Sequence, residues 1–214
     1  MTMATFGPEA AHIFRITHVS NVPWILDYGL HCKSSPVADP NFVPIGMPDL
    51  IQRRTTRTVP CGPGGTLGDY VPFYFTPWSV MMLNIKTGYN NVIKRPNSEI
   101  VILVSSLPKL QETGTRFVFT NGHAYLQESD YFEDLSDLTR IDWDLLRSRD
   151  FKRDPDDPGK VGRYQAEALA HRHVPVSGLL GIACYDETVG HRIERETHSR
   201  GLSIDAKAIP SWYF

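Results

Sequence analysis

A carboxylate and an amide stand two residues apart late in the chain, in the run Gln165-Ala-Glu167. Side chains alternate sides along a strand, so a period of two across residues 163–173 places Gln165, Glu167 and Leu169 on one face. A polar pair would then stand at the start of an otherwise apolar strand. This position suits an ionised carboxylate at the rim of a cleft with a neutral amide beside it. A solvated strand face or an amphipathic helix fits the same residues.

Other residues supply chemistry that matches such a carboxylate. Arg15 lies on the polar face of an expected strand, three more arginines occupy positions 53, 54 and 57, and aromatic residues crowd positions 70–75. Arginines suit a diphosphate, aromatic rings suit a flat heterocycle, and a glutamate suits an oxocarbenium-like transition state or a nucleophile that must lose a proton. These are the needs of an enzyme that breaks the glycosidic bond of a nucleotide.

Several competing chemistries are weaker. The Gly-Pro-Gly-Gly run at 62–65 lacks the lysine of a phosphate loop, and no Gly-x-Ser-x-Gly elbow of a hydrolase occurs. Cys184 lies in an apolar run, which predicts a buried structural thiol. His171 and His173 near Glu167 would need one continuous strand to share a metal. We therefore expect no metal.

Composition bounds the class of protein. The 214 residues carry a net charge of −2, with a pI near 6.4, which argues against a strongly electrostatic binder of duplex DNA. Three cysteines without paired spacing indicate a reducing compartment. The first residues show no charged leader, and no run is long enough to cross a membrane. We expect one cytoplasmic domain over residues 1–214.

Local patterns predict a mixed α+β domain with six to eight short strands. The expected strands are 12–18, 70–76, 100–104, 116–120, the 163–173 run and 181–185, and the expected helices are 22–28, 48–54, 78–85, 106–114, 142–149 and 187–198. Residues 31–46 are expected to form a loop. Pro72 predicts that the 70–76 strand lies at a sheet edge.

Several distinctive blocks follow one another along nearly the whole chain: the 14–26 run with Gly29-Leu30, Ile51-Gln-Arg-Arg, the 64–75 run containing Tyr-Val-Pro-Phe-Tyr-Phe, Met82-Leu83, Phe117-Val-Phe-Thr-Asn-Gly-His-Ala, Gln165-Ala-Glu and Trp212-Tyr213. In this order, the blocks resemble the DarT family of DNA ADP-ribosyltransferase toxins. The resemblance implies an ADP-ribosyltransferase fold with a split mixed β-sheet and short helices around an NAD cleft. It also implies a monomer that modifies a base in single-stranded DNA, with an antitoxin that removes ADP-ribose.

The resemblance assigns roles by position. Glu167 matches the catalytic glutamate and Arg54 the essential arginine, while a one-residue gap leaves Arg53 and Arg57 open for the same role. The remaining positions divide between NAD and DNA: Thr17, His18, Asn21, Tyr74 and Gln165 for NAD, and His123, Lys152, Arg153, Lys160 and Arg163 for DNA, the last four in or beside the 149–162 loop.

One departure concerns the base. The thymine-modifying branch of the family begins its first strand with His-x-Thr-His, whereas this chain has Arg15-Ile-Thr-His18. The arginine resembles the guanine-modifying branch and could bind the NAD diphosphate, which favours guanine. The same residues are compatible with a transferase that acts on thymine, RNA or protein, with a plain NAD glycohydrolase, and with a noncatalytic nucleic-acid-binding module.

Overall fold

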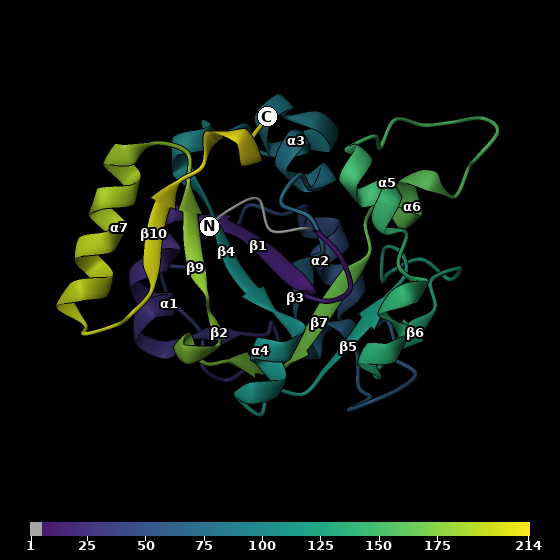
Figure 1. Cartoon of the computed structure of the whole chain (residues 1–214), viewed down its shortest axis with the longest axis horizontal. Coiled ribbons are helices and arrows are strands. Elements are labelled where there is room, and N and C mark those ends of the chain that lie inside the picture. Colours follow the sequence, from purple (N-terminus) through teal and green to yellow (C-terminus); the bar gives the residue numbers. More distant parts are fainter. Residues whose placement is uncertain (1–5) are drawn as a thin grey trace.

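A computed structural model describes residues 6–214 as an α+β fold built on one large sheet (Figure 1). The absence of a leader, predicted from the first residues, concerns positions 1–5, which lie outside this range. Eight strands form the sheet in the order β10-β9-β4-β1-β3-β7-β5-β6, and β2 pairs with β8 in a second, two-stranded sheet. Among residues 6–214, no helix combines the length and apolarity needed to cross a membrane.

The strands are short and mostly antiparallel, with only β9 and β10 parallel in the large sheet. Their bounds are β1 His12–His18, β2 Leu30–His31, β3 Tyr70–Tyr74, β4 Ile100–Ser106, β5 Phe117–Thr120, β6 Tyr131–Phe132, β7 Glu167–His171, β8 His173–Val174, β9 Gly181–Cys184 and β10 Asp205–Ala208.

Helices connect the strands and cover the sheet. They are α1 Val22–Tyr28, α2 Pro48–Arg54, α3 Val80–Thr87, α4 Leu107–Glu112, α5 Trp143–Ser148, α6 Lys160–Arg163 and α7 Glu187–Ser199, and short 3₁₀ segments lie in several of the connections. Proline in the first turn of α1, α2 and α4 is already set to the helical φ and lacks the amide hydrogen that a first turn leaves unpaired. In Figure 1, α7 lies along the β10 edge, far from β5 and β6.

The sheet opens in the middle, between β1 and β3. These neighbours share a single registered pair, Phe14 with Tyr74, whereas β1 and β4 pair from His12 to His18. The gap divides the sheet into one half that ends at β1 and another that starts at β3. This is the split sheet that the resemblance implied.

Pro72 lies at this gap. The prediction of an edge strand is wrong, because β3 lies between β1 and β7. The amide and carbonyl of one strand residue point to the same side, and the Pro72 carbonyl accepts from Arg15 Nη1 at 2.8 Å on the β1 side. The missing amide hydrogen therefore faces the gap, where no strand partner needs it.

The core lies on both faces of the sheet. Alternate residues of β4 enter different clusters, Val101 and Leu103 with the α1 and α4 side chains, and Ile102 with α3 and Trp212. Burial on both faces explains the continuous apolar run that predicted a central strand.

Two differences from the predicted elements affect the site. The 163–173 run is a strand only from Glu167, because Arg163 ends α6 and the chain turns before β7. Arg172 has φ +62° and ends β7, so His171 and His173 lie on different strands. Residues 6–214 contain ten strands instead of six to eight, because three pairs of residues form strands too short to show a pattern.

Candidate active site

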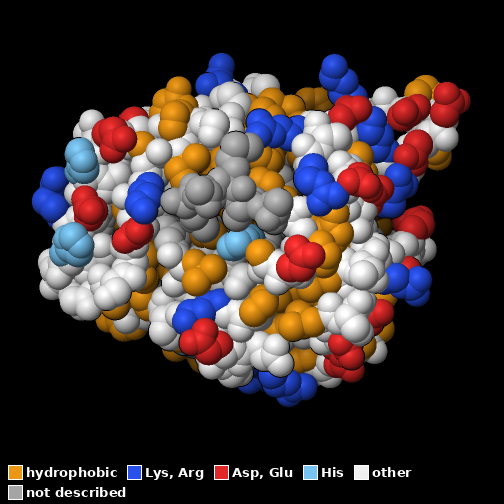
Figure 2. Space-filling view, viewed as in Figure 1, with side chains coloured by type: hydrophobic (Ala, Val, Ile, Leu, Met, Phe, Trp, Pro, Cys, Tyr) orange, Lys and Arg blue, Asp and Glu red, His pale blue; other side chains and the backbone are white. Residues whose placement is uncertain are grey.

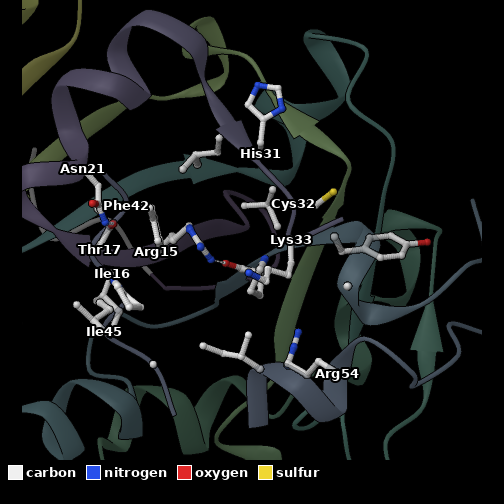
Figure 3. A pocket seen from close by; sticks show the side chains of 18 of the residues that line it. Arg15, Ile16, Thr17, Asn21, His31, Cys32, Lys33, Phe42, Ile45 and Arg54 are labelled. Atoms are coloured by element: carbon white, nitrogen blue, oxygen red, sulfur yellow. Dashed lines mark hydrogen bonds between the residues drawn. The ribbon is translucent and has the colours of Figure 1, made fainter. Parts of the chain in front are cut away.

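A cavity of about 370 Å³ lies at the gap in the sheet and takes lining residues from both halves. Thr17 comes from β1, Tyr74 from β3 and Glu167 from the first position of β7. Figure 3 shows Arg15 and Arg54 entering the cavity from different elements. The volume is within the usual range of about 300–1,000 Å³ for small-molecule sites.

Glu167 is the buried carboxylate of this cavity, with 2 % of its side chain exposed. Arg54 binds it with both Nη groups, Nη1 to Oε1 at 3.1 Å and Nη2 to Oε2 at 2.8 Å. The amide of Ala124 donates to Oε1 at 2.9 Å. From residues 6–214, Oε1 thus accepts two hydrogen bonds and Oε2 one, so Oε2 keeps one lone pair for a substrate.

The ionisation of this pair follows from its surroundings. Burial alone would raise the pKa of Glu167, but the charge of Arg54, the neighbouring His123 ring and the donated hydrogen bonds lower it below its ordinary value. Burial alone would lower the pKa of Arg54, and Glu167 raises it above its ordinary value. Glu167 is therefore a carboxylate at neutral pH.

Backbone contacts fix where Glu167 stands. Its amide donates to Thr120 Oγ1 at 3.2 Å, and its Cα is registered opposite Tyr74 across β3 and β7. Thr120 ends β5 and donates its hydroxyl to the carbonyl of Gly122 at 2.6 Å. Two strands and the turn after β5 therefore hold the carboxylate.

The structure distinguishes the three candidate arginines. Arg54 alone contacts Glu167, because Arg53 Nε donates to the carbonyl of Asp49 and Arg57 Nη2 to that of Leu126. Arg54 closes the last turn of α2, where it faces the cavity.

His123 stands beside Glu167 as a neutral ring. Its Nδ1 lies 3.3 Å from Oε1 and accepts from the amide of Tyr125 at 3.2 Å. Burial lowers the pKa of His123, an effect that Glu167 opposes. The sequence assigned His123 to DNA, and the structure places it in the lining of the cavity.

Arg15 brings a positive charge into the cavity with no carboxylate partner among residues 6–214. Its Nη1 donates to Pro72, and its buried Nε has no hydrogen-bond partner in that range. Burial lowers the pKa of Arg15 to about 10, which leaves it protonated at neutral pH. A charged group with an unused buried donor fits an anion such as a diphosphate.

Asn21 lines the cavity and holds one of its walls. Its Nδ2 donates to Thr17 Oγ1 at 3.0 Å and to the Val43 carbonyl at 2.9 Å, and its Oδ1 accepts from the Val43 amide at 2.8 Å. Both amide hydrogens are used, and the side chain does not cap α1. Asn21 therefore fixes the 37–47 segment against β1.

The predicted NAD residues do not all reach the cavity. Arg15, Thr17, Asn21 and Tyr74 line it, whereas His18 contacts Glu99, with Nε2 3.4 Å from Oε2. Gln165 is not in β7, and its Nε2 donates to the carbonyl of Val161 at 3.0 Å. The expected shared strand face of Gln165 and Glu167 is therefore wrong.

Sequence reasoning missed one wall of the cavity. The expected loop at 31–46 supplies lining residues from His31 to Gly46, including the half-exposed Phe42. Apolar residues within a proline-rich loop, such as Phe42, were the available signal. Nothing in the local pattern showed that the loop folds back over β1.

The four predicted DNA residues near α6 fall into two kinds. Lys160 pairs with Asp150 at 2.6 Å, and Arg163 binds Asp157 through both Nη groups. Lys152 and Arg153 form no ion pair with residues 6–214. Figure 2 shows basic and acidic side chains mixed over this protruding segment.

The weaker sequence candidates stay outside the site. His171 packs on Tyr70 and His173 on His31, and residues 6–214 contain no group of three possible ligands that could hold a metal. Cys184 is fully buried, and burial raises the pKa of its thiol to about 12, which confirms a structural thiol.

Comparison with known proteins identifies the family. Residues 14–214 match the family described as ssDNA thymidine ADP-ribosyltransferase, DarT. The chain belongs to the DarT family. It is 50 % identical over 211 residues to a DNA ADP-ribosyl transferase of Escherichia coli O127:H6, covering 99 % of this chain and 97 % of that protein. A DNA ADP-ribosyl transferase of Thermus sp. strain 2.9 is 35 % identical, with 87 % of each chain covered.

Solved structures of DarT share the fold. Thermus sp. 2.9 DarT in complex with ADP-ribosylated ssDNA has a TM-score of 0.86 at 29 % identity, covering 97 % of this chain and 98 % of that one. The same enzyme in complex with NAD⁺ has a TM-score of 0.83. The predicted α+β ADP-ribosyltransferase fold is confirmed.

The DarT cavity of this chain fits NAD on its own evidence. Its lining carries Arg15, Lys33 and Arg54 against Asp39 and Glu167, an excess of positive charge suited to a diphosphate. Thr17 and Tyr74 add hydroxyl groups at the wall. When bound, NAD supplies an ADP-ribosyl group with nicotinamide as the leaving group.

Proposed function

We propose that this chain transfers ADP-ribose from NAD to a thymine base in single-stranded DNA and acts as the toxin of a toxin–antitoxin pair. The enzyme class follows from the family: the chain is an NAD-dependent DNA ADP-ribosyltransferase. The observation that carries the proposal is the buried, ionised Glu167, held by both Nη groups of Arg54 at the wall of a cavity that fits NAD.

The residues divide the chemistry between them. Glu167 Oε2 has the free lone pair that can accept a proton from an attacking base or a hydrogen bond from a ribose hydroxyl. Arg54 keeps this carboxylate ionised and fixes its orientation. Arg15 would bind the diphosphate through Nε.

Thymine is favoured by the family description, which names thymidine. The guanine prediction rests on Arg15 alone, and its Nη1 already serves the Pro72 carbonyl in the gap of the sheet. This use of the side chain gives Arg15 a role that is independent of the base. Guanine stays a prediction that the same experiment tests.

The experiment uses NAD and single-stranded oligonucleotides that each lack one base type, with mass spectrometry to detect the addition of one ADP-ribose. We expect the addition to disappear only when thymine is absent. Loss only without guanine would overturn the thymine proposal and support the prediction from Arg15. Free ADP-ribose without modified DNA would overturn DNA as the acceptor and favour a glycohydrolase.

The biological role is proposed from the chemistry of the product. A base carrying ADP-ribose blocks pairing, so the cell needs an enzyme that removes the group, and we propose such an antitoxin as the partner. Because the acceptor is DNA, the action would be cytoplasmic, and a monomer suffices because all the site residues named come from one chain. Expression of the wild type should stop growth and that of Glu167→Ala should not; equal toxicity would contradict the role.

A further inference from the structure

Arg53 is the exposed member of the three arginines at and just after the end of α2. Its Nε donates to the carbonyl of Asp49 at 3.3 Å, and its two Nη groups make no hydrogen bond to residues 6–214. The guanidinium carbon lies 5.8 Å from the centre of the Tyr125 ring. Arg53 therefore presents an uncompensated charge at the surface, directed toward the loop after β5.

The neighbouring arginines are already committed. Arg54 follows Arg53 about 100° around the helix and is neutralised by Glu167 inside the cavity. Arg57 is half-buried and donates to the Leu126 carbonyl at 3.0 Å, which braces the same loop. Arg57 also has an Nε without a partner among residues 6–214, but this atom is buried. Of the three, Arg53 is the one whose side chain is exposed with both Nη groups free of hydrogen bonds to residues 6–214.

The loop beside Arg53 is tied to the catalytic carboxylate. The Ala124 amide donates to Glu167, and the His123 amide donates to the carbonyl of Gly162 at 2.9 Å. The next two residues, Tyr125 and Leu126, come to the surface, half-buried and 39 % exposed respectively. A ring and an apolar side chain thus stand one and two residues from a group that holds Glu167.

We infer that Arg53 binds a backbone phosphate of single-stranded DNA beside the reacting base, while Tyr125 and Leu126 pack against the base of the adjoining nucleotide. The inference rests on the proposed function, because it needs DNA as the acceptor. A reacting base must leave the stack to reach the cavity, so its phosphates and its neighbour lie at the rim. Positive charge beside aromatic and apolar side chains is the usual surface for single strands.

The first test is the salt dependence of DNA binding and modification by Arg53→Gln. Losing one phosphate contact should reduce the slope of log affinity against log salt by about 0.7, and should weaken modification at limiting DNA about tenfold. The control is Arg192→Gln, the same charge change on an exposed residue of α7 at the far side of the sheet, which should leave both quantities unchanged. An unchanged slope in Arg53→Gln would overturn the inference.

The second test identifies the phosphate. Oligonucleotides carrying one neutral methylphosphonate linkage are compared with the wild type and Arg53→Gln, one linkage at a time. At one linkage next to the modified base, the neutral group should weaken wild-type modification about tenfold and Arg53→Gln hardly at all. If the loss caused by the neutral linkage is the same in Arg53→Gln as in the wild type at every linkage, the two changes are independent and the inference is overturned.

A third measurement distinguishes a structural role of Arg53 from a role in DNA binding. NAD hydrolysis without DNA is measured on the same preparations, because a disturbed α2 would also misplace Arg54 and slow this reaction. An equal fall in hydrolysis and DNA modification would overturn the inference. The proposed function fails in a different way, namely if the wild type hydrolyses NAD and leaves every oligonucleotide unmodified.

Discussion

Two arginine–carboxylate pairs of this molecule share one geometry and differ in burial. Arg54 binds Glu167 through both Nη groups at 3.1 and 2.8 Å, and Arg163 binds Asp157 through both at 3.0 and 2.7 Å. The side chains of the first pair are 13 % and 2 % exposed, and those of the second 41 % and 39 %. The two pairs have the same two-bond geometry, although Arg163 also binds Asp142 through Nε at 3.3 Å, so the main difference between the pairs is their exposure to water.

Burial gives the first pair its chemistry. Water screens the two charges of the exposed pair, and when this ion pair separates both ions are solvated. In the cavity, each charge depends on the other, so the carboxylate stays ionised without solvent and in a fixed orientation. The same pairing is thus a surface contact in one place and the centre of the site in the other.

The largest effect is expected from Glu167→Ala. Transfer should fall by at least about 10³-fold, because the group that accepts a proton is gone. The variant should also lose about 3–5 kcal/mol of unfolding free energy, because Arg54 remains buried without its partner. Activity assays and urea unfolding measure both, and NAD binding by calorimetry should persist.

Asp157→Ala is the matched control for this prediction, since it removes the carboxylate of the exposed pair. It should unfold at the wild-type urea concentration. Near-normal transfer by Glu167→Ala would remove Glu167 from the chemistry, and equal destabilisation by the two variants would show that burial does not separate the pairs.

Arg54→Lys should cause the second-largest loss of transfer. Lysine keeps the charge but cannot form two parallel hydrogen bonds, so we expect transfer to fall about 10²-fold. Arg163→Lys makes the same change in the exposed pair and should leave transfer unchanged within error. Arg57→Ala tests the assignment of Arg54 as the essential arginine. If Arg57→Ala lost more transfer activity than Arg54→Ala, the essential arginine would be misidentified.

The pH dependence of stability gives a smaller effect with a defined sign. Glu167 has a pKa lowered from its ordinary 4.5, so its contribution to unfolding free energy is full above 4.5 and lost as pH falls toward the folded-state pKa. The difference in unfolding free energy between wild type and Glu167→Gln should therefore stay constant from pH 7 to about 5 and shrink below it. A difference that shrinks above pH 6 would contradict a lowered pKa.

A substitution of Asn21 should change the KM for NAD by a few fold. Asn21→Asp keeps the shape and removes both amide hydrogens, so the 37–47 segment loses its attachment at the Val43 carbonyl. We expect the KM for NAD to rise about fivefold with kcat little changed, since the wall and not the carboxylate is disturbed. A fall in kcat at constant KM would show a direct role in the reaction.

Local patterns predicted most of the fold because the main elements carry strong local signals. The alternation of 12–18 and the proline at the start of α2 gave bounds that the structure confirms. β10 was missed because Asp205–Ala208 alternates charge with alanine, and only parallel pairing to β9 makes it a strand. Four residues with alanine as their apolar half give too weak a β signal to predict a strand, so this element depends on its pairing with β9.

The site was only partly predictable for a similar reason. Family resemblance supplied Glu167 and Arg54, but their contact joins residues 113 positions apart and required the fold. Gln165 was misplaced because a turn after α6 uses the residues that the period-two pattern assigned to a strand. The attachment of Asn21 to Val43 depends on a loop path that no local pattern describes.

The smallest effects are expected from residues 152–163, which include the end of the loop after α5 and helix α6, and where exposed and paired cations can be compared again. Lys152→Gln with Arg153→Gln removes two cations that have no ion pair within residues 6–214, and should lower the ratio of DNA modification to NAD hydrolysis about threefold. Lys160→Gln with Arg163→Gln removes two cations already bound to Asp150 and Asp157, and should change this ratio less. The reason is that a cation held by a carboxylate must give up that contact before it gains a phosphate. The ratio of DNA modification to NAD hydrolysis is compared at two salt concentrations. If it falls equally in the two double variants, DNA displaces the carboxylates and the whole segment contacts the DNA strand.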